Sequence, residues 1–155
     1  MAQSVQINGL DALSEDFRRL AEEELPQMKR ELHVALAGQL REEVVKSLGD
    51  RAKSNTGKIA GMQEKYVGSG GGYAAVRPQR GKNEKGYAYG YITNSLENGH
   101  VIRRPSGRWK GYRARIKKKY VLGIHFYERA GRAAEKLAID GANRLADQIK
   151  QKLEK

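Results

Sequence analysis

The fold is decided by residues 10–49, which read LDALSEDFRRLAEEELPQMKRELHVALAGQLREEVVKSLG. Apolar residues return there at steps of three, four and occasionally five, which is the spacing of one stripe on an α-helix. The stripe consists of Leu13, Phe17, Leu20, Leu25, Met28, Leu32, Leu36, Leu40, Val44 and Leu48. Pro26 lacks an amide proton and clashes with the carbonyl four residues back, so we expect a kink or break near Leu25. Gly49 is a natural left-handed stop, and the stretch predicts a long amphipathic helix.

A second helix is predicted from about Tyr127 to Leu153. Its stripe consists of Ala130, Ala134, Leu137, Gly141, Leu145, Ile149 and Leu153. The small residues Ala130, Ala134 and Gly141 allow a partner element to approach closely. Such a stripe is buried only when a sheet or another helix lies opposite it.

The region between the two helices is rich in glycine and in residues typical of strands. Twelve of the eighteen glycines fall between Gly57 and Gly111. Three short strands are predicted, bounded by turn residues: Lys58–Val67, Tyr73–Arg77 and Tyr87–Leu96. In the third, a period of two places Tyr87, Tyr89, Tyr91 and Thr93 on one face. The loops between the strands, residues 68–72 (GSGGG) and 79–86 (QRGKNEKG), are typical of hairpin loops.

The expected fold class is therefore α+β, with a long N-terminal helix and a C-terminal helix packed on a small antiparallel β-sheet, and with a long basic loop. A length of 155 residues fits a single domain. We divide it into four segments: a helix at 10–49, a glycine-rich β-sheet region at 57–100, a basic arm at 101–121 and a helix at 127–154.

Composition excludes several kinds of chemistry. The chain has no cysteine, which excludes disulfides, Cys-ligated zinc, iron–sulfur clusters and thiol nucleophiles. No run approaches the roughly 20 apolar residues of a membrane span, and the start MAQSVQINGL has no features of a secretory signal. The three histidines are not at metal-ligand spacing, and neither a nucleophile elbow nor a P-loop is present. We therefore expect no enzyme, no cofactor and no metal.

Charge is distributed unevenly along the chain. The formal net charge is +12, yet residues 1–50 carry −4, because ten acidic side chains there outnumber six basic ones. Residues 77–119 carry +11, from thirteen basic and two acidic side chains. Nearly all of the positive excess therefore lies in one stretch.

Within that stretch, the basic arm holds nine basic side chains with no acidic one, and Trp109 and Tyr112 lie among them. The basic residues are Arg103, Arg104, Arg108, Lys110, Arg113, Arg115, Lys117, Lys118 and Lys119. Three interpretations are open: binding of nucleic acid through phosphate contacts and stacking, binding of an acidic protein surface, or a solvated loop that maintains solubility. The acidic surface includes a neighbouring copy of this chain, whose first fifty residues are net negative. The aromatic residues favour a partner over a solvated loop.

The order of these segments resembles a known family. A long amphipathic helix is followed by Asn55-Thr56-Gly57-Lys58, then by Leu96-Glu97-Asn98-Gly99-His100, and after the basic arm by residues 123–130 (GIHFYERA). This resembles the tail-completion or head–tail joining proteins of long-tailed bacteriophages, the minor tail protein Z-like family (gene product ten of the HK-ninety-seven type). The residues that match the family motifs are Thr56, Gly57, Glu97, Gly99, Phe126, Arg129 and Ala130. Asn98, His100 and Tyr127 depart from the pattern.

The resemblance implies a structural virion protein without enzymatic activity. Such a protein assembles as a ring, expected to be a hexamer, at the head–tail junction, and it contacts neck, connector and tail-tube proteins. It resides in the bacterial cytoplasm before assembly, and DNA passes through its ring without tight binding. On this hypothesis the arm from Arg103 to Lys119 reaches across to an adjacent subunit, with Gly99 and Gly107 as pivots. The alternative is a basic nucleic-acid-binding protein.

Overall fold

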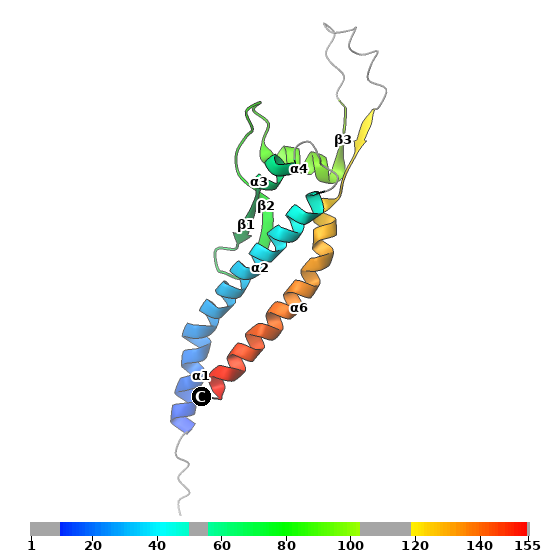
Figure 1. Cartoon of the computed structure of the whole chain (residues 1–155). Coiled ribbons are helices and arrows are strands. Elements are labelled where there is room, and N and C mark those ends of the chain that lie inside the picture. The colour runs from blue at the N-terminus through cyan, green and yellow to red at the C-terminus, as the bar shows by residue number, and fades with distance from the viewer. Residues whose placement is uncertain (1–9, 50–55, 103–118, 155) are drawn as a thin grey trace, which may run out of the picture.

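A computed structural model describes residues 10–49, 56–102 and 119–154, and its fold is α+β as expected (Figure 1). The predicted N-terminal helix is one continuous helical rod in three parts: α1 (Leu10–Arg19), the π-helical turn η1 (Leu20–Glu24) and α2 (Leu25–Leu48). No helix in the described ranges is long and apolar enough to cross a membrane.

Near Leu25, where we expected a kink or a break, the rod is unbroken and contains the π-helical turn η1. Its last hydrogen bond runs from the Leu25 amide to the Leu20 carbonyl, five residues back, and Pro26 follows in the first turn of α2. The wider π-turn accommodates a residue that has no amide to donate. The left-handed stop expected at Gly49 is wrong, because Gly49 has a right-handed φ of −51° and its amide bonds to the Lys46 carbonyl at 3.1 Å.

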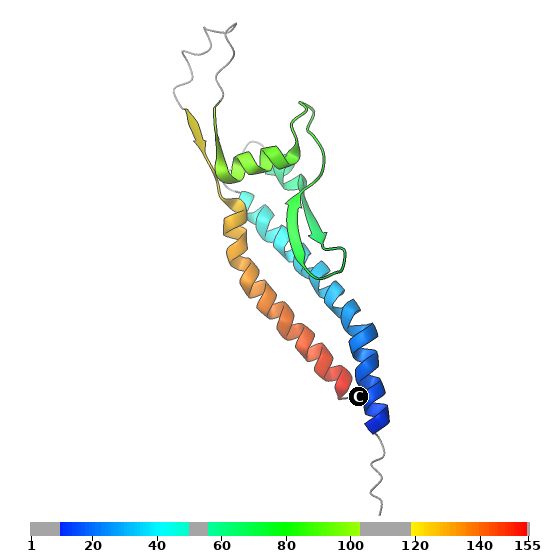
Figure 2. The same cartoon turned by 180° about the vertical axis from the view of Figure 1, so that it is seen from behind.

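The predicted C-terminal helix is confirmed as α6 (Phe126–Leu153), which runs antiparallel to α2 along its length (Figures 1 and 2). The two helices are in contact at Gly141, which is buried, and a Cβ there would lie 2.9 Å from Leu32 Cδ1. At the far end, Lys152 Nζ lies 2.7 Å from a Glu24 carboxylate oxygen. That hydrogen bond holds the pKa of Glu24 below its ordinary value.

The region after α2 begins with a helix rather than with the predicted strand. Residues Thr56–Gly61 form the short helix α3, and only Gln63–Val67 form the strand β1. The predicted strand at Tyr73–Arg77 is confirmed as β2 (Ala74–Pro78). It pairs antiparallel with β1, with Gln63 opposite Pro78, and the loop at 68–72 closes this hairpin as expected. The hairpin lies against α2 on the side away from α6 (Figures 1 and 2).

The third predicted strand, Tyr87–Leu96, is wrong, because residues Tyr89–Asn98 form the helix α4. Tyr89, Ile92, Thr93 and Leu96 recur at the helical spacing of i, i+3, i+4 and i+7. Thr93 is buried and Leu96 packs against the core, whereas Tyr87 and Tyr91 are exposed. The alternation of tyrosines therefore gave a misleading period of two.

A second two-stranded sheet lies beyond α4, so the single sheet that we predicted is two separate ribbons. The strands β3 (Gly99–Val101) and β4 (Tyr120–Leu122) pair antiparallel, with His100 opposite Val121. Among the described elements, the β1–β2 hairpin packs broadly on α2, and α6 also packs on α2 rather than on either sheet.

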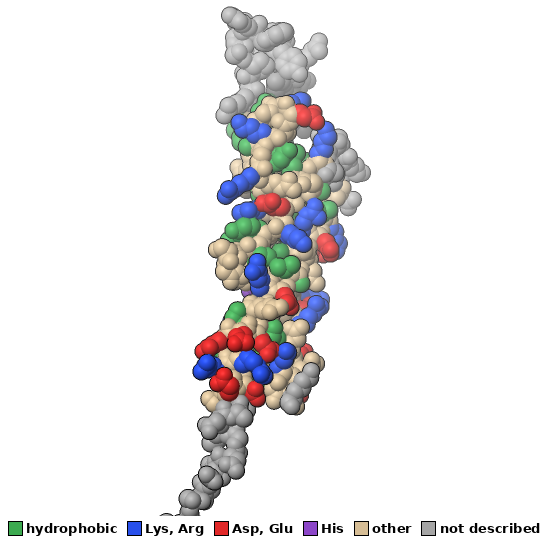
Figure 3. All heavy atoms as spheres, turned by 90° about the vertical axis from the view of Figure 1, so that its left-hand side faces the viewer, with side chains coloured by type: hydrophobic (Ala, Val, Ile, Leu, Met, Phe, Trp, Pro, Cys, Tyr) green, Lys and Arg blue, Asp and Glu red, His purple; other side chains and the backbone are tan. Residues whose placement is uncertain are grey.

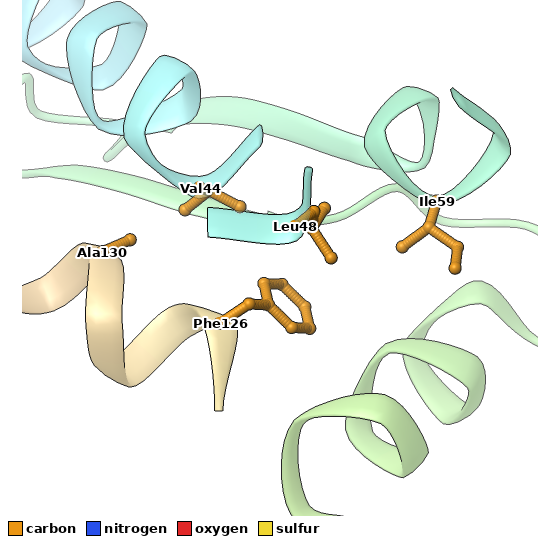
Figure 4. Close-up of a cluster of buried hydrophobic side chains, with 5 residues drawn as sticks. All are labelled: Val44, Leu48, Ile59, Phe126 and Ala130. Carbon is orange, nitrogen blue, oxygen red and sulfur yellow. The ribbon is translucent and has the colours of Figure 1, made fainter. Parts of the chain in front are cut away.

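The apolar core lies where the C-terminal end of α2 meets the beginning of α6 and the helix α3. It consists of Val44, Leu48, Ile59, Phe126 and Ala130. Figure 4 shows the Phe126 ring directed at Leu48. Phe126 and Leu48 are fully buried and anchor one end of the helix pair.

The first prediction compares the two glycines of α6. Gly131→Ala raises the free energy of unfolding by about 0.5–1 kcal/mol, because nothing lies within 4 Å of its new Cβ and alanine is the better helix former. Gly141→Ala loses that gain, because its methyl meets the Leu32 and Leu36 side chains and forces the helices apart. Urea unfolding of both variants measures the difference. An equal gain in both would show that the helices are not in close contact at Gly141.

Candidate assembly interface

Glu97 caps the beginning of α6 from another element. The residue before this helix, His125, has a left-handed φ of 49° and no side-chain capping bond. The Glu97 carboxylate, near the end of α4, instead accepts hydrogen bonds from the amides of Tyr127 at 2.9 Å and Glu128 at 3.1 Å. It satisfies two free amides and places a negative charge at the positive end of the helix dipole. One side chain thus fixes α6 to α4.

Two glycines allow the β3–β4 ribbon to start next to Glu97 and the beginning of α6. Gly99 has a left-handed φ of 79°, and a Cβ there would lie 2.6 Å from the Tyr120 hydroxyl and 2.7 Å from the Gly123 nitrogen. A Cβ on Gly123 would overlap the Glu97 carbonyl and lie 2.7 Å from the Asn98 carbonyl carbon. Backbone therefore packs directly on backbone here, and no other residue fits at either position without displacing it.

Arg129 links the same region to α2. Its guanidinium donates to the carbonyl of Ile124 and, at 2.7 Å, to the carbonyl of Ser47 in the last turn of α2. Carbonyls at a helix end have no partner within the helix, and a cation there also suits the helix dipole. Phe126 and Ala130 lie beside it in the core.

Five of the seven residues that match the family motifs thus meet at one place, which we call the junction: Glu97, Gly99, Phe126, Arg129 and Ala130. Thr56 and Gly57 belong to α3, and the structure describes only their place in that helix. Of the departing residues, Asn98 accepts a 2.7 Å hydrogen bond from the Tyr120 hydroxyl through its carbonyl. The junction is a cluster of structural contacts that fixes the direction of the ribbon.

A buried polar network supports the junction, and our sequence analysis missed it. The side chain of Gln63 is fully buried, and its amide nitrogen lies 3.2 Å from both the Ile59 carbonyl and the Thr93 hydroxyl. The Tyr127 hydroxyl donates to the Gln63 side-chain oxygen, and Arg41 Nε donates to its backbone carbonyl at 2.8 Å. A glutamine at the start of a strand gives no sign of this in the sequence.

The β3–β4 ribbon that leaves the junction exposes apolar side chains. Val101 is 68% exposed and Leu122 is 81% exposed, and Tyr120 and Val121 are exposed as well. The ladder continues from the Ile102 amide to the Lys119 carbonyl at 3.0 Å. A two-stranded ribbon without a covered face is marginal alone, and clustered exposed apolar residues mark interaction sites.

The ribbon carries the basic arm, most of which lies outside the described residues. Of the arm residues that we predicted to form an interface, Lys119 is the one that the structure describes, and its side chain is exposed. The ten other predicted arm residues fall at 103–118 and have no described position; they are Arg103, Arg104, Arg108, Trp109, Lys110, Tyr112, Arg113, Arg115, Lys117 and Lys118.

The opposite end of the molecule has the opposite charge. Residues 10–24 hold six acidic and two basic side chains, for a net charge of −4. Figure 3 shows acidic side chains gathered at the α1–η1 end, with basic ones among them. Arg18 and Arg19 pair only with acidic residues of the same rod, at 3.1 to 3.9 Å.

The second prediction tests the cap. Glu97→Ala lowers the free energy of unfolding by about 1–2 kcal/mol, because two amides of α6 lose their acceptor. Glu135→Ala is the control, since Glu135 is exposed in the middle of the same helix. Chemical denaturation measures both variants, and equal effects would contradict the capping role.

The third prediction concerns Tyr127. Burial, reinforced by the negative charge of Glu97, raises the pKa of Tyr127 to about 12. The folded chain therefore holds this proton more tightly than the unfolded chain, in which the pKa is about 10. The free energy of unfolding then falls as the pH rises from about 10 towards 12. Urea unfolding across this range shows a weaker decline in Tyr127→Phe than in the exposed control Tyr91→Phe, and equal declines would contradict it.

Comparison with known proteins identifies no relative of this chain. No family model matches the chain, and neither a curated protein nor a solved structure matches it. The interpretation of the junction and the ribbon therefore rests on their own geometry and on the motifs quoted above.

Proposed function

We propose that this chain is a structural subunit of a long-tailed bacteriophage or phage-tail-like particle. It forms a hexameric ring where the head of the particle joins the tail. There it completes or terminates the tail and contacts neck and tail-tube proteins. The assignment to a phage rests on the family resemblance. The assignment to an assembly rests on the surfaces described above.

The observation that carries the proposal is the exposed apolar ribbon. Val101 and Leu122 are more than two-thirds exposed on strands that pair only with each other among the described elements. Exposure of this kind costs free energy in water, and a neighbouring protein that covers both side chains recovers it. The junction holds the ribbon clear of the core, ready to reach such a neighbour (Figures 1 and 2).

A ring needs two different surfaces on each subunit. Its contacts are heterologous, so one patch of a subunit meets a different patch of the next. The chain offers such a pair, with the ribbon, to which the basic arm is joined in the sequence, near one end and the acidic α1–η1 segment at the other. Opposite charges favour correct encounter and disfavour contact between like ends.

The arm supplies most of the charge in this scheme. Nine basic side chains within residues 103–119 repel one another and are neutralised by an acidic neighbour. Glu97, Gly99 and Gly123 set the direction of the ribbon, from which the arm continues in the sequence. Binding of DNA is not required, because DNA passes through a ring without being held tightly.

The fourth prediction tests the arm. Replacement of Arg113, Arg115, Lys117 and Lys118 by Glu abolishes assembly of the full chain, because the arm then repels the acidic surface that it meets. Analytical ultracentrifugation over a range of protein concentrations and electron microscopy of the product measure assembly.

The control carries the same change of net charge, from +12 to +4, at exposed sites away from the arm: Lys29, Lys65, Lys136 and Arg144, each replaced by Glu. Rings from the arm variant would contradict the proposal. The alternative nucleic-acid-binding protein would instead remain monomeric and bind DNA with an affinity that falls steeply with salt.

A further inference from the structure

A groove lies between α3, α4 and the loop at residues 79–86. It encloses about 490 Å³. The apolar residues that line it are Ile59, Met62, Tyr89 and Ile92. Ile59 is 6% exposed and the other three are half-buried. Such a lining suits a few apolar side chains of a partner.

The rim of the groove is basic on balance. Lys58 of α3 and Lys85 of the loop line it, together with the acidic Glu84. The same loop also carries Arg80 and Lys82, which are exposed but do not line the groove. Two basic side chains thus line the groove against one acidic one, and the loop as a whole is net positive, which favours an acidic partner.

The helix α1 has the complementary properties. Leucine or phenylalanine recurs at positions 10, 13, 17 and 20, which share one face of a helix. Phe17 is 49% exposed, and α1 packs broadly only against η1, the turn that continues it, among the described elements. Residues 10–24 carry a net charge of −4. This is an acidic helix whose apolar positions share one face in the sequence, and Phe17 on that face is exposed.

We propose that α1 of one copy of this chain docks in the groove of the next copy. The two surfaces of a single chain cannot meet, because α2 separates them. Its 24 residues span about 36 Å. The cartoons show α1 before α2 and, near the other end of α2, the helices α3 and α4 (Figures 1 and 2), whose residues line the groove. The contact is therefore made between copies.

Helix-in-groove recognition explains how the contact works. An amphipathic helix places side chains three and four residues apart into an apolar groove, and rim charges set its orientation. Here Phe17 is the anchor and Leu20 is its neighbour, while the acidic residues of α1 and η1 face the basic rim. A head-to-tail contact of this kind closes into a ring when its rotation closes. The inference thus deepens the proposed function and rests on it.

Disulfide cross-linking of the full chain tests the contact directly, because the chain has no cysteine of its own. Ser14→Cys places a thiol one turn from Phe17 on an exposed position. Gly61→Cys places one in the groove, where an added Cβ meets nothing within 4 Å. The two single-cysteine variants, one of them isotopically labelled, are mixed under mild oxidation. A disulfide between them requires Cα atoms within about 7 Å.

The expected result is a mixed dimer that forms about tenfold faster than the one between Ser14→Cys and Gly131→Cys. Gly131 is the matched control, since it is also an exposed helical glycine with open space. Addition of Phe17→Glu to the Ser14→Cys chain abolishes the excess, whereas addition of Ile139→Glu, at an equally exposed apolar site, does not. Circular dichroism checks that each variant is folded.

Two outcomes overturn the inference and are distinguishable. If the chain assembles in the ultracentrifuge but both pairs cross-link at the same rate, this contact is wrong and the proposed ring stands on another interface. If the chain stays monomeric at every concentration and neither pair cross-links, the contact and the self-assembled ring both fail.

Discussion

A helix of 28 residues begins at Phe126 without a capping side chain of its own, and Glu97 supplies the missing acceptor from a distant part of the sequence. This constraint ties three elements together, because α4 ends and β3 begins within two residues of Glu97, and α6 begins opposite it. Gly99 and Gly123 then allow the backbones to touch. Glu97 and the two glycines together hold the start of the exposed ribbon against the beginning of α6.

The stability of the molecule is concentrated at the same end. Leu48 and Phe126 are fully buried, and Gln63 and Thr93 form a satisfied polar layer beside them. Along the rest of α6, only Gly141 is buried among the described residues, and an exposed ion pair, which contributes little in water, holds the far end. Among the described residues, most of the buried apolar side chains therefore lie where α2 meets the start of α6, and Gly141 is the buried contact farther along the pair.

Features that depend on one helical stripe were predictable from the sequence. Both long helices follow from periodicity, and the loop at 68–72 with the strand β2 follows from turn residues, whereas the kink or break expected near Leu25 is a π-helical turn in a continuous rod. The helix α4 was not predicted, because Tyr87, Tyr89 and Tyr91 gave an apparent period of two that masked the true spacing of Ile92, Thr93 and Leu96. The network around Gln63 was beyond prediction, since its partners lie 30 and 64 positions away and meet only in the fold.

The helix α4 also relates the two candidate contacts to each other. Its first turns line the groove through Tyr89 and Ile92, and its last turn carries Glu97, which holds the junction. Thr93, between them, is buried against Gln63. A partner helix seated in the groove thus contacts the same ten-residue element from which the ribbon starts. Because Thr93 joins the middle of this helix to the buried Gln63, the groove-lining residues and Glu97 are held on one element by the same polar contact.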